Sequence, residues 1–304
     1  MYLVDNRNCT DPFINLATEE YLVRHLNCSQ DSYLFLYINE PCIVLGKNQS
    51  IYREVNFDFI RNNKLKLCRR ISGGGTVYQD EGNLNFAFIT SFSNERVNNY
   101  AYFNRLIIDA LSKAGLKTTA DTRNNILFNN KKISGNAQFT DRKNMISHGT
   151  LLFDADLDNL RSALKENPFS IETKAPRSVS SSVTNMKGSM ANIESTGHLK
   201  QFIEAFAQAQ GTLTLTDGEW DIIQKTARDK FESFEWVYGR SPLTTITRGK
   251  ILISIDEGII SAISNGSEKD SVWKELIGVR YCSDDVRIKL SNLANAEELM
   301  AILF

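Results

Sequence analysis

The chain has 304 residues, of which 42% are hydrophobic and 23% are charged, and its formal net charge is −1. These fractions are ordinary for a folded globular protein, and the length predicts one large domain or one large and one small domain. A net charge so close to zero excludes a global electrostatic attraction to nucleic acid or to an acidic membrane. We therefore expect no nucleic-acid and no membrane partner, and any affinity for phosphate must come from a local site.

The cysteines and the first residues predict a cytoplasmic protein. The five cysteines are scattered without CxxC pairs or metal-like spacing, and their odd number argues against a disulfide framework. Residues 1–7 carry a charge at the fifth position and lack the apolar core of a signal peptide. No later run approaches the roughly 18 apolar residues of a membrane span. We expect a reducing compartment and no secretion.

The first part of the chain predicts helices that alternate with short strands. Asp11-Pro12 is typical of a helix start, because an N-cap side chain is followed by proline at the first helical position. Residues 33–38 and 42–45 are expected to form two short strands in a hairpin-like arrangement. Periodicity and turn residues then predict a helix at 55–63, strands at 66–71 and 85–90, and a helix at 99–114.

The rest of the chain predicts further strands, a polar segment and a smaller C-terminal unit. Strands are expected at 124–128, 131–139 and 148–153, then a helix at 156–164, a mobile and mildly basic serine-rich loop at 174–189, and a helix at 196–210. Beyond a seam at 211–216, we expect a helix at 217–231, a hairpin of 251–255 with 259–263, and a helix at 296–303. The predicted class is α+β: a large domain of mixed or antiparallel sheets flanked by helices over residues 1–212, and a small α+β domain over residues 217–304.

A triple glycine behind two arginines is the most informative stretch. Arg69 and Arg70 precede Gly73, Gly74 and Gly75. Glycines without a Cβ allow positive φ and let an anion approach bare peptide N–H groups. The spacing matches neither a P-loop nor a Rossmann fingerprint, since the bend joins two strands. A flexible hairpin with solvated arginines is the alternative that the pattern leaves open.

Two further stretches could line the same site. Residues 131–138 place small side chains at Ser134, Gly135 and Ala137, which predicts close approach of a ligand or of another backbone segment. Strand alternation allows only one of Lys131 and Lys132 to point into a site. Residues 178–185 are either a hydrophilic linker or a lid over phosphates with basic neighbours at 174, 177 and 187.

Other catalytic patterns are missing from the sequence. His148 is the histidine expected in the core region, where a structural role and a ligand contact are about equally plausible. No Ser–His–acid or Cys–His constellation is visible, and no cluster of metal ligands is visible.

Taken together and in this order, these stretches resemble the lipoate–protein ligase A family. The family pattern RRxSGGGxVxHDxGN is similar to Arg69–Asn83, and its strand pair is similar to Asn124–Ile126 with Lys132–Ala137. An HGTLL segment stands at His148–Leu152, and an RSxVTN segment resembles Arg177–Asn185 with one extra residue. The similarity covers nearly all of residues 1–210, and the tail resembles the family's accessory domain.

The resemblance implies a biotin/lipoate ligase-like fold and a two-step reaction. ATP would activate lipoate to lipoyl-AMP, and the lipoyl group would pass to a lysine of an acceptor domain. Such acceptors are the E2 subunits of 2-oxoacid dehydrogenases and the H protein of glycine cleavage. The implied cofactors are ATP and Mg²⁺, although no carboxylate cluster announces a metal site. By family match, Lys132 is the catalytic residue that bridges the carboxylate and the α-phosphate.

The resemblance also implies which residues bind lipoate, ATP and lipoyl-AMP. Arg70 and the N–H groups of residues 73–78 would cradle phosphates, Asn83 would contact the adenylate, and the segment 174–187 would close over it. The full expected set is Arg70, Ser72, Gly73, Gly74, Gly75, Thr76, Val77, Tyr78, Asn83, Lys132, Ser134, Gly135, Ala137, His148, Gly149, Thr150, Ser182 and Val183.

Two departures from the family pattern leave other readings open. Gln79 stands where the family usually has histidine, and Asn125 stands where it usually has aspartate. One rival is an octanoyl or lipoyl transferase of the same fold; no cysteine lies in residues 131–152 to serve as its nucleophile, but a lysine-dependent amidotransferase stays open. A second rival is a non-catalytic protein that holds lipoate or lipoyl-AMP. A biotin ligase is disfavoured, since its arginine- and glycine-alternating loop is absent.

Overall fold

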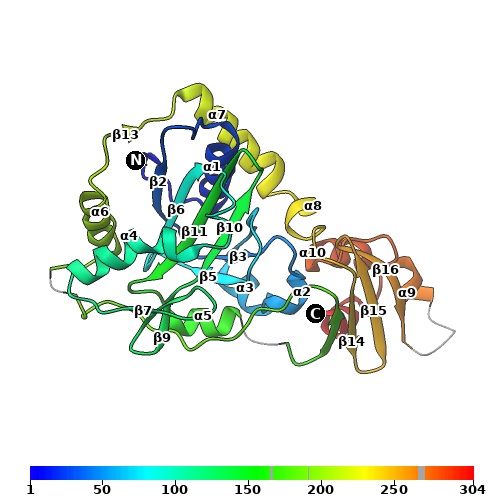
Figure 1. Ribbon diagram of the computed structural model, residues 1–304. Helices are drawn as coiled ribbons and strands as arrows, with labels where there is room; N and C mark the ends of the chain where they lie inside the picture. The colour runs from blue at the N-terminus through cyan, green and yellow to red at the C-terminus, as the bar shows by residue number, and fades with distance from the viewer. Residues whose placement is uncertain (165–166, 191, 266–270) are drawn as a thin grey trace.

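A central mixed sheet organises the protein. A computed structural model of the chain describes residues 1–164, 167–190, 192–265 and 271–304. The six-stranded sheet has the order β10-β11-β6-β2-β1-β13 (Figure 1). Its strands are β1 (Tyr2–Val4), β2 (Tyr33–Ile38), β6 (Asn83–Ser91), β10 (Asn136–Thr140), β11 (Asn144–Leu152) and β13 (Thr212–Leu213). The mixture of helices and sheets confirms the expected α+β class.

Helices cover both faces of this sheet. On one face of the sheet, side chains of β2 and β6 pack in one hydrophobic cluster with α4 (Tyr100–Lys113) and α6 (Thr196–Phe206). The side chains on the opposite face pack in a second cluster with α1 (Pro12–His25). Because the strand period is two, each strand contributes alternate residues to the two clusters. The second face also carries the candidate site.

The start of α1 follows the sequence prediction closely. The Asp11 carboxylate accepts hydrogen bonds from the N–H groups of Phe13 and Ile14 at 2.8 and 3.2 Å, and Pro12 occupies the first turn. These bonds satisfy N–H groups that have no partner within the helix. The fixed N-terminus places the buried side chains of Leu16, Glu19 and Val23 against the central sheet.

The strands β2 and β3 (Cys42–Leu45) do not form the expected hairpin. Strand β3 lies in a separate three-stranded sheet, between β4 (Lys66–Arg69) in parallel and β5 (Val77–Gln79) in antiparallel orientation. All four residues of β3 are buried, so pairing on both edges satisfies more backbone groups than a terminal hairpin would. The triple glycine joins β4 to β5, as a bend within one sheet.

One expected helix is present and one expected strand is divided. The helix expected at 55–63 is α3 (Phe57–Asn63), capped by Asn56, and the helix before it, α2 (Ile51–Glu54), was not expected. The expected strand at 131–139 breaks at Gly135. Its first half, β9 (Lys131–Ser134), joins a small sheet with β7 (Thr119–Ala120) and β8 (Ile126–Phe128), and its second half is β10. The break turns the chain from one sheet into another beside the site.

A four-stranded sheet with the order β12-β14-β15-β16 forms the C-terminal part (Figure 1). Its first strand, β12 (Ser170–Thr173), comes from earlier in the chain and pairs with β14 (Thr244–Arg248). The expected hairpin is present as β15 (Ile251–Asp256) and β16 (Ile259–Ser264). The helices of this region are α8 (Phe234–Val237), α9 (Ser271–Glu275), α10 (Ser283–Leu290) and α11 (Ala296–Leu303).

The segment between the two parts is helical. The expected helix at 217–231 is α7 (Asp217–Thr226) continued by a π-helix, η1 (Ala227–Phe231), and both pack against α1. The division into units at 212 and 217 stays a prediction. Among the described residues, no helix has the length and apolar character to cross a membrane.

Candidate functional site

Two adjoining cavities lie between the central sheet and the glycine bend. The first has a volume of about 360 Å³ and the second a volume of about 460 Å³. Their walls overlap, because both are lined by Thr76, Val77, Lys132, Gly135, Thr150 and Ser178. The bend, strand β9 and the serine-rich segment therefore meet at the junction of two chambers.

Glycine is favoured at one position in the bend and at one position beside it. Gly74 has φ +89°, a conformation that favours glycine. The carbonyl oxygen of Gly74 lies 2.1 Å from the point where a Cβ on Gly46 would stand. By contrast, a Cβ on Gly73 would meet nothing within 4 Å. The bend is thus pressed against the end of β3, and it is not a loose hairpin.

Arg70 holds the bend from inside. Its guanidinium donates to the carbonyl oxygens of Gly73 and Gly75 at 2.6 and 2.7 Å, to Val44 O at 3.2 Å, and to Ser72 Oγ at 3.0 Å. Burial lowers its pKa to about 10, so it remains a cation at neutral pH. Arg70 also lines the first cavity. Most of its hydrogen bonds therefore hold the bend, and its guanidinium adds a positive charge to the cavity wall.

Arg69 points the opposite way and has a different role, which the sequence did not reveal. Its side chain is fully buried and donates to the carbonyl oxygens of Gly46, Gln49 and Val237 at 3.0, 2.7 and 2.6 Å. The indole N–H of Trp236 donates to the Arg69 carbonyl oxygen at 2.7 Å. One residue therefore ties the strand before the bend to α8 and to the loop before α2.

A buried hydrogen-bond chain runs behind the bend through His148. Its Nε2 lies 2.7 Å from Ser72 Oγ, and its Nδ1 lies 2.7 Å from Glu19 Oε2. Tyr37 donates to the other oxygen of Glu19 at 3.0 Å. The sequence showed no Ser–His–acid constellation, but the fold creates one. Ser72 is 1% exposed, so this chain orients the bend and His148 and does not present a nucleophile.

Glu19 is a wall residue of the first cavity that sequence reasoning missed. A signal existed, because Leu16, Glu19 and Val23 share one face of the helix that begins at Pro12. An acid on an otherwise apolar helix face is expected to be buried with a partner. The partner, His148, lies on a distant strand, and the sequence alone does not bring the two together.

Lys132 is the lysine that enters the site. It lines both cavities, whereas Lys131 is exposed and lines only the second. A Cβ on Gly135 would stand 2.9 Å from Lys132 Nζ, so the space left by this glycine is filled by the lysine itself. Burial lowers the pKa of Lys132, while the charge of Asp121 raises it. The ammonium is thus held over the strand break at the cavity junction.

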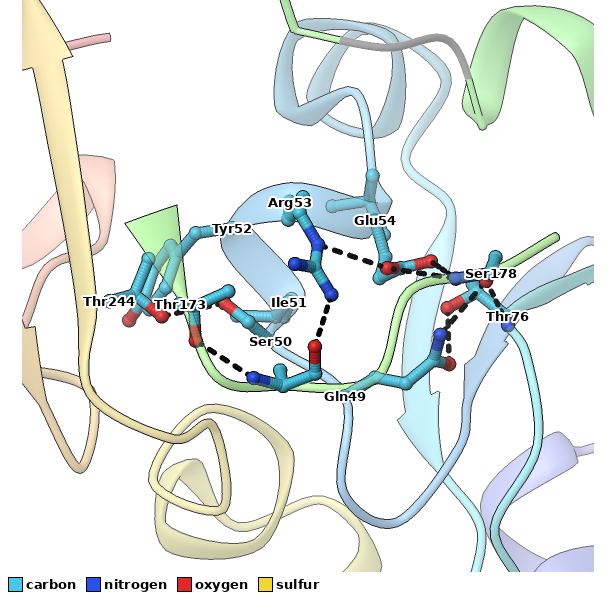
Figure 2. A network of polar contacts seen from close by, with 12 residues as sticks. Gln49, Ser50, Ile51, Tyr52, Arg53, Glu54, Thr76, Thr173, Ser178 and Thr244 are labelled. Carbon is cyan, nitrogen blue, oxygen red and sulfur yellow. Dashed lines mark hydrogen bonds and ion pairs between the residues drawn. The ribbon is translucent and has the colours of Figure 1, made fainter. Parts of the chain in front are cut away.

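The serine segment, residues 178–183, contributes lining residues to both cavities. Ser178 Oγ accepts from the Thr76 N–H at 2.9 Å and from Gln49 Nε2 at 2.8 Å (Figure 2). The Ser178 N–H donates to Glu54 Oε1 at 3.3 Å. At the other end, the Lys132 N–H donates to the Ser182 carbonyl at 2.8 Å. The segment is therefore anchored on the glycine bend and on β9; its expected mobility stays a prediction.

Most of the expected site residues line one or both cavities. These are Arg70, Gly74, Gly75, Thr76, Val77, Tyr78, Lys132, Ser134, Gly135, Ala137, His148, Gly149, Thr150, Ser182 and Val183. Ser72, Gly73 and Asn83 line neither. Asn83 is 0% exposed and donates to Asn85 Oδ1 at 3.3 Å, and its contact with an adenylate stays a prediction.

The two positions that depart from the family pattern are both on cavity walls. Gln79 lines the first cavity and accepts from Asn39 Nδ2 at 2.7 Å, and Asn39 accepts in turn from Asn15. Asn125 also lines this cavity and donates from Nδ2 to the Asp121 carboxylate at 2.8 Å. In the part of the chain that the structure describes, no three His, Cys, Asp or Glu side chains gather as a metal site.

This fold and this pair of cavities define a biotin/lipoate ligase-like protein. Residues 11–210 match the model of the lipoyl protein ligase A/B catalytic domain. The chain belongs to this family. The lipoate-protein ligase LplJ of Bacillus subtilis is 39% identical over 82% of this chain and 77% of its own length. Lipoate–protein ligase 1 of Staphylococcus aureus is 40% identical over 80% and 74%, respectively. The chain is therefore an enzyme of the ligase type.

More distant relatives share the fold and widen the range of activities. A lipoate-protein ligase A bound with ATP has a TM-score of 0.65 at 23% identity and covers 79% of this chain and 98% of its own. A ligase of Thermoplasma acidophilum with bound lipoic acid has a TM-score of 0.66 at 22% identity, over 78% and 98%. A human mitochondrial lipoyl amidotransferase is 28% identical over 93% of this chain and 83% of its own length.

Proposed function

We propose that this protein is an ATP-dependent lipoate–protein ligase that forms lipoyl-AMP and transfers the lipoyl group to a lysine of an acceptor domain. The observation that carries the proposal is the position of Lys132 on the wall shared by two cavities. A ligase of this kind must bring two molecules to one point, and one cation at that point must serve both. The lipoate bound to one structural relative and the ATP bound to another support the two occupants.

Each cavity suits one substrate by its lining. The first extends to the aliphatic side chains of Leu16, Val44 and Ala137, which suit the chain and ring of lipoate. The second has apolar side chains such as Leu164 beside hydroxyls and cations, including Arg161 and Ser182, and the hydroxyls and cations suit a nucleotide and its phosphates. We assign lipoate to the first cavity and ATP to the second.

The chemistry of the first step explains why a buried ammonium is needed. A carboxylate that attacks the α-phosphate brings two anions together, and negative charge increases on the phosphoryl oxygens. Lys132 would neutralise both groups, and Arg70 would add positive charge from behind the bend. The serine segment would shield the adenylate from water until an acceptor lysine attacks it.

The Mg²⁺ expected for this chemistry has no protein site of its own among the described residues. Glu54 is the carboxylate on the second cavity, and it pairs with Arg53 at 3.5 Å and with the Ser178 N–H. These residues do not form a metal site, since Mg²⁺ needs free oxygen ligands in octahedral arrangement.

The test is a pyrophosphate-release assay with ATP and lipoate, followed by addition of a purified lipoyl domain of an E2 subunit. We expect adenylate formation without the domain and lipoylation of its lysine with it. Lys132→Met should lower adenylate formation by at least about a thousandfold, because one charge in a dry site contributes on the order of 4 kcal/mol. Lys113→Met, at an exposed lysine that lines neither cavity, is the control and should retain activity.

The same assay separates the proposal from an amidotransferase, the activity named for the human relative. An amidotransferase takes its acyl group from a lipoylated donor protein and needs no ATP. Two results together contradict the ligase proposal: lipoylation from such a donor that is as fast without ATP as with it, and no release of pyrophosphate when ATP and lipoate are present. Free lipoate that is bound but never activated contradicts both.

A further inference from the structure

The turn after β7 holds a carboxylate whose bonds converge on one cavity residue. Asp121 Oδ1 accepts from the N–H groups of Arg123 and Asn125 at 2.8 and 2.9 Å. Its Oδ2 accepts from Asn125 Nδ2 at 2.8 Å. Although burial raises the pKa of Asp121, hydrogen bonds from Asn125 and Arg123 and the charge of Lys132 lower it below the ordinary value. The group is therefore a carboxylate at neutral pH and can only accept.

An acceptor at this position determines how the Asn125 amide is turned. A carboxylate bonds to the NH₂ end of an amide and repels its oxygen, so Nδ2 must face Asp121 and Oδ1 must face away. Asn125 is 7% exposed and lies on the wall of the first cavity. The hydrogen bond to Asp121, and not contact with solvent, therefore fixes the orientation of the Asn125 amide.

The free oxygen of Asn125 lies on the same side of Gly135 as the Lys132 ammonium. A Cβ on Gly135 would stand 4.0 Å from Asn125 Oδ1 and 2.9 Å from Lys132 Nζ. Glycine at 135 leaves room for the ammonium. Asn125 Oδ1 and the Lys132 ammonium therefore border the same space beside the strand break.

We infer that Asp121 is a positioning residue for the reaction: through Asn125 it directs an oxygen toward the space that the Lys132 ammonium borders. The inference rests on the proposed function, since it assigns Lys132 the adenylation step. It also explains how an asparagine can stand at position 125, because the neighbouring turn supplies the negative charge. The orienting carboxylate lies four residues earlier in the chain.

Other charged groups around Lys132 define what Asp121 opposes. Arg70 on the bend and Arg123 on the same turn both lower the pKa of Lys132, in addition to its burial. The remaining ionisable groups on the two cavities are Glu19, Tyr37, Arg53, Glu54, Tyr78, Lys131, His148, Arg161 and Arg177. Asp121 is the charge that raises the pKa of Lys132. Its loss must therefore let Lys132 lose its proton at a lower pH.

The deciding experiment begins with the single variant Asp121→Asn. Asp121→Asn keeps an oxygen for the turn but places an NH₂ group opposite Asn125, so the amide turns over and presents its own NH₂ group to Lys132. We expect the kcat of lipoate-dependent pyrophosphate release to fall on the order of tenfold, as when the outer partner of a metal ligand is removed. KM for ATP should stay within about twofold, and the alkaline limb of the rate should move to lower pH.

The double variant Asp121→Asn with Asn125→Asp tests the positional argument. The amide introduced at position 121 would then donate to the new carboxylate at position 125, and one oxygen of that carboxylate would face Lys132 directly. We expect kcat and the alkaline limb to return to the values of the unchanged protein. A double variant that folds but is no more active than Asp121→Asn overturns the inference.

A matched turn elsewhere controls for a purely structural role. Asp141 caps the β10–β11 turn in the same way, with its Oδ1 accepting from the N–H groups of Lys143 and Asn144 at 2.9 and 2.8 Å. It lines neither cavity, so Asp141→Asn should leave kcat and the pH profile unchanged. If Asp141→Asn and Asp121→Asn lower kcat equally, Asp121 acts only on the turn. If the unchanged protein releases no pyrophosphate, the proposed function fails and this inference fails with it. If the unchanged protein and Asp121→Asn release pyrophosphate with the same kcat and pH profile, only the inference is refuted.

Discussion

The two walls that face each other across the cavity junction are held in different ways. The glycine bend is supported from beneath by buried arginines and by direct backbone contact with Gly46. The serine segment is anchored by Ser178 at one end and by backbone bonds to β9 at the other. Between these anchors Val179 is 61% exposed. Segments with few buried contacts open locally at low cost in free energy, whereas buried networks open only with the whole fold.

The contrast agrees with the role that we propose for each wall. A wall that recognises phosphate must keep its geometry before the ligand arrives, because preorganised groups need no rearrangement in the transition state. A wall that admits substrates and an acceptor lysine must be able to move. Figure 2 shows that Ser178 connects the two, since it bonds both to Thr76 at the bend and to Gln49 and Glu54 near α2. The following variants break or sharpen this difference.

The largest effect is expected at Arg69. Arg69→Met keeps the volume but leaves the buried carbonyls of Gln49 and Val237 without a donor and removes one of two donors to the Gly46 carbonyl. Each such loss costs about 1–3 kcal/mol, so the free energy of unfolding should fall on the order of 4 kcal/mol. Urea denaturation measures it. The exposed Arg61→Met should change stability by less than about 0.5 kcal/mol. A loss below about 1 kcal/mol for Arg69→Met contradicts the buried support.

A smaller effect is expected where the bend touches β3. Gly46→Ala pushes a methyl group into the Gly74 carbonyl, 2.1 Å away, and overpacking of this kind costs about 1–3 kcal/mol. Gly73→Ala adds the same atom where nothing lies within 4 Å, so its stability should be nearly unchanged. Thermal unfolding compares the two. If both variants are equally stable, the bend can shift to accommodate the added methyl group, and it is then no more rigid than the serine segment.

The smallest effect on stability is expected in the serine segment. Ser178→Ala removes the acceptor of the Thr76 N–H and of Gln49 Nε2, at a cost of about 1 kcal/mol. Because the loss is local, amide hydrogen exchange in residues 176–183 should become faster while global unfolding hardly changes. Ser180→Ala, at an exposed serine of the same segment, is the control. Unchanged exchange in Ser178→Ala indicates that the backbone bonds to β9 alone hold the segment.

Local sequence determined the parts of this protein that depend on neighbouring residues. The Asp11-Pro12 cap begins a helix because its hydrogen bonds close within three residues. The choice of Lys132 over Lys131 follows from strand alternation together with family resemblance, and Lys132 alone lines both cavities. The triple glycine indicated a special backbone, and Gly74 has one. Propensity, capping and spacing are short-range effects, so they can be read directly from the chain.

Tertiary structure decided which distant residues meet. Strand β3 leaves β2 for β4 and β5, because pairing partners depend on the whole sheet and not on the intervening turn. Adjacent arginines receive opposite roles, since alternation sends Arg69 toward α8 and Arg70 into the bend. The approach of Glu19 to His148 across 129 residues is visible only once α1 packs on the central sheet. Sequence thus determined the residues of the triple-glycine stretch, and long-range packing decided which of them hold the bend in place and which line the cavities.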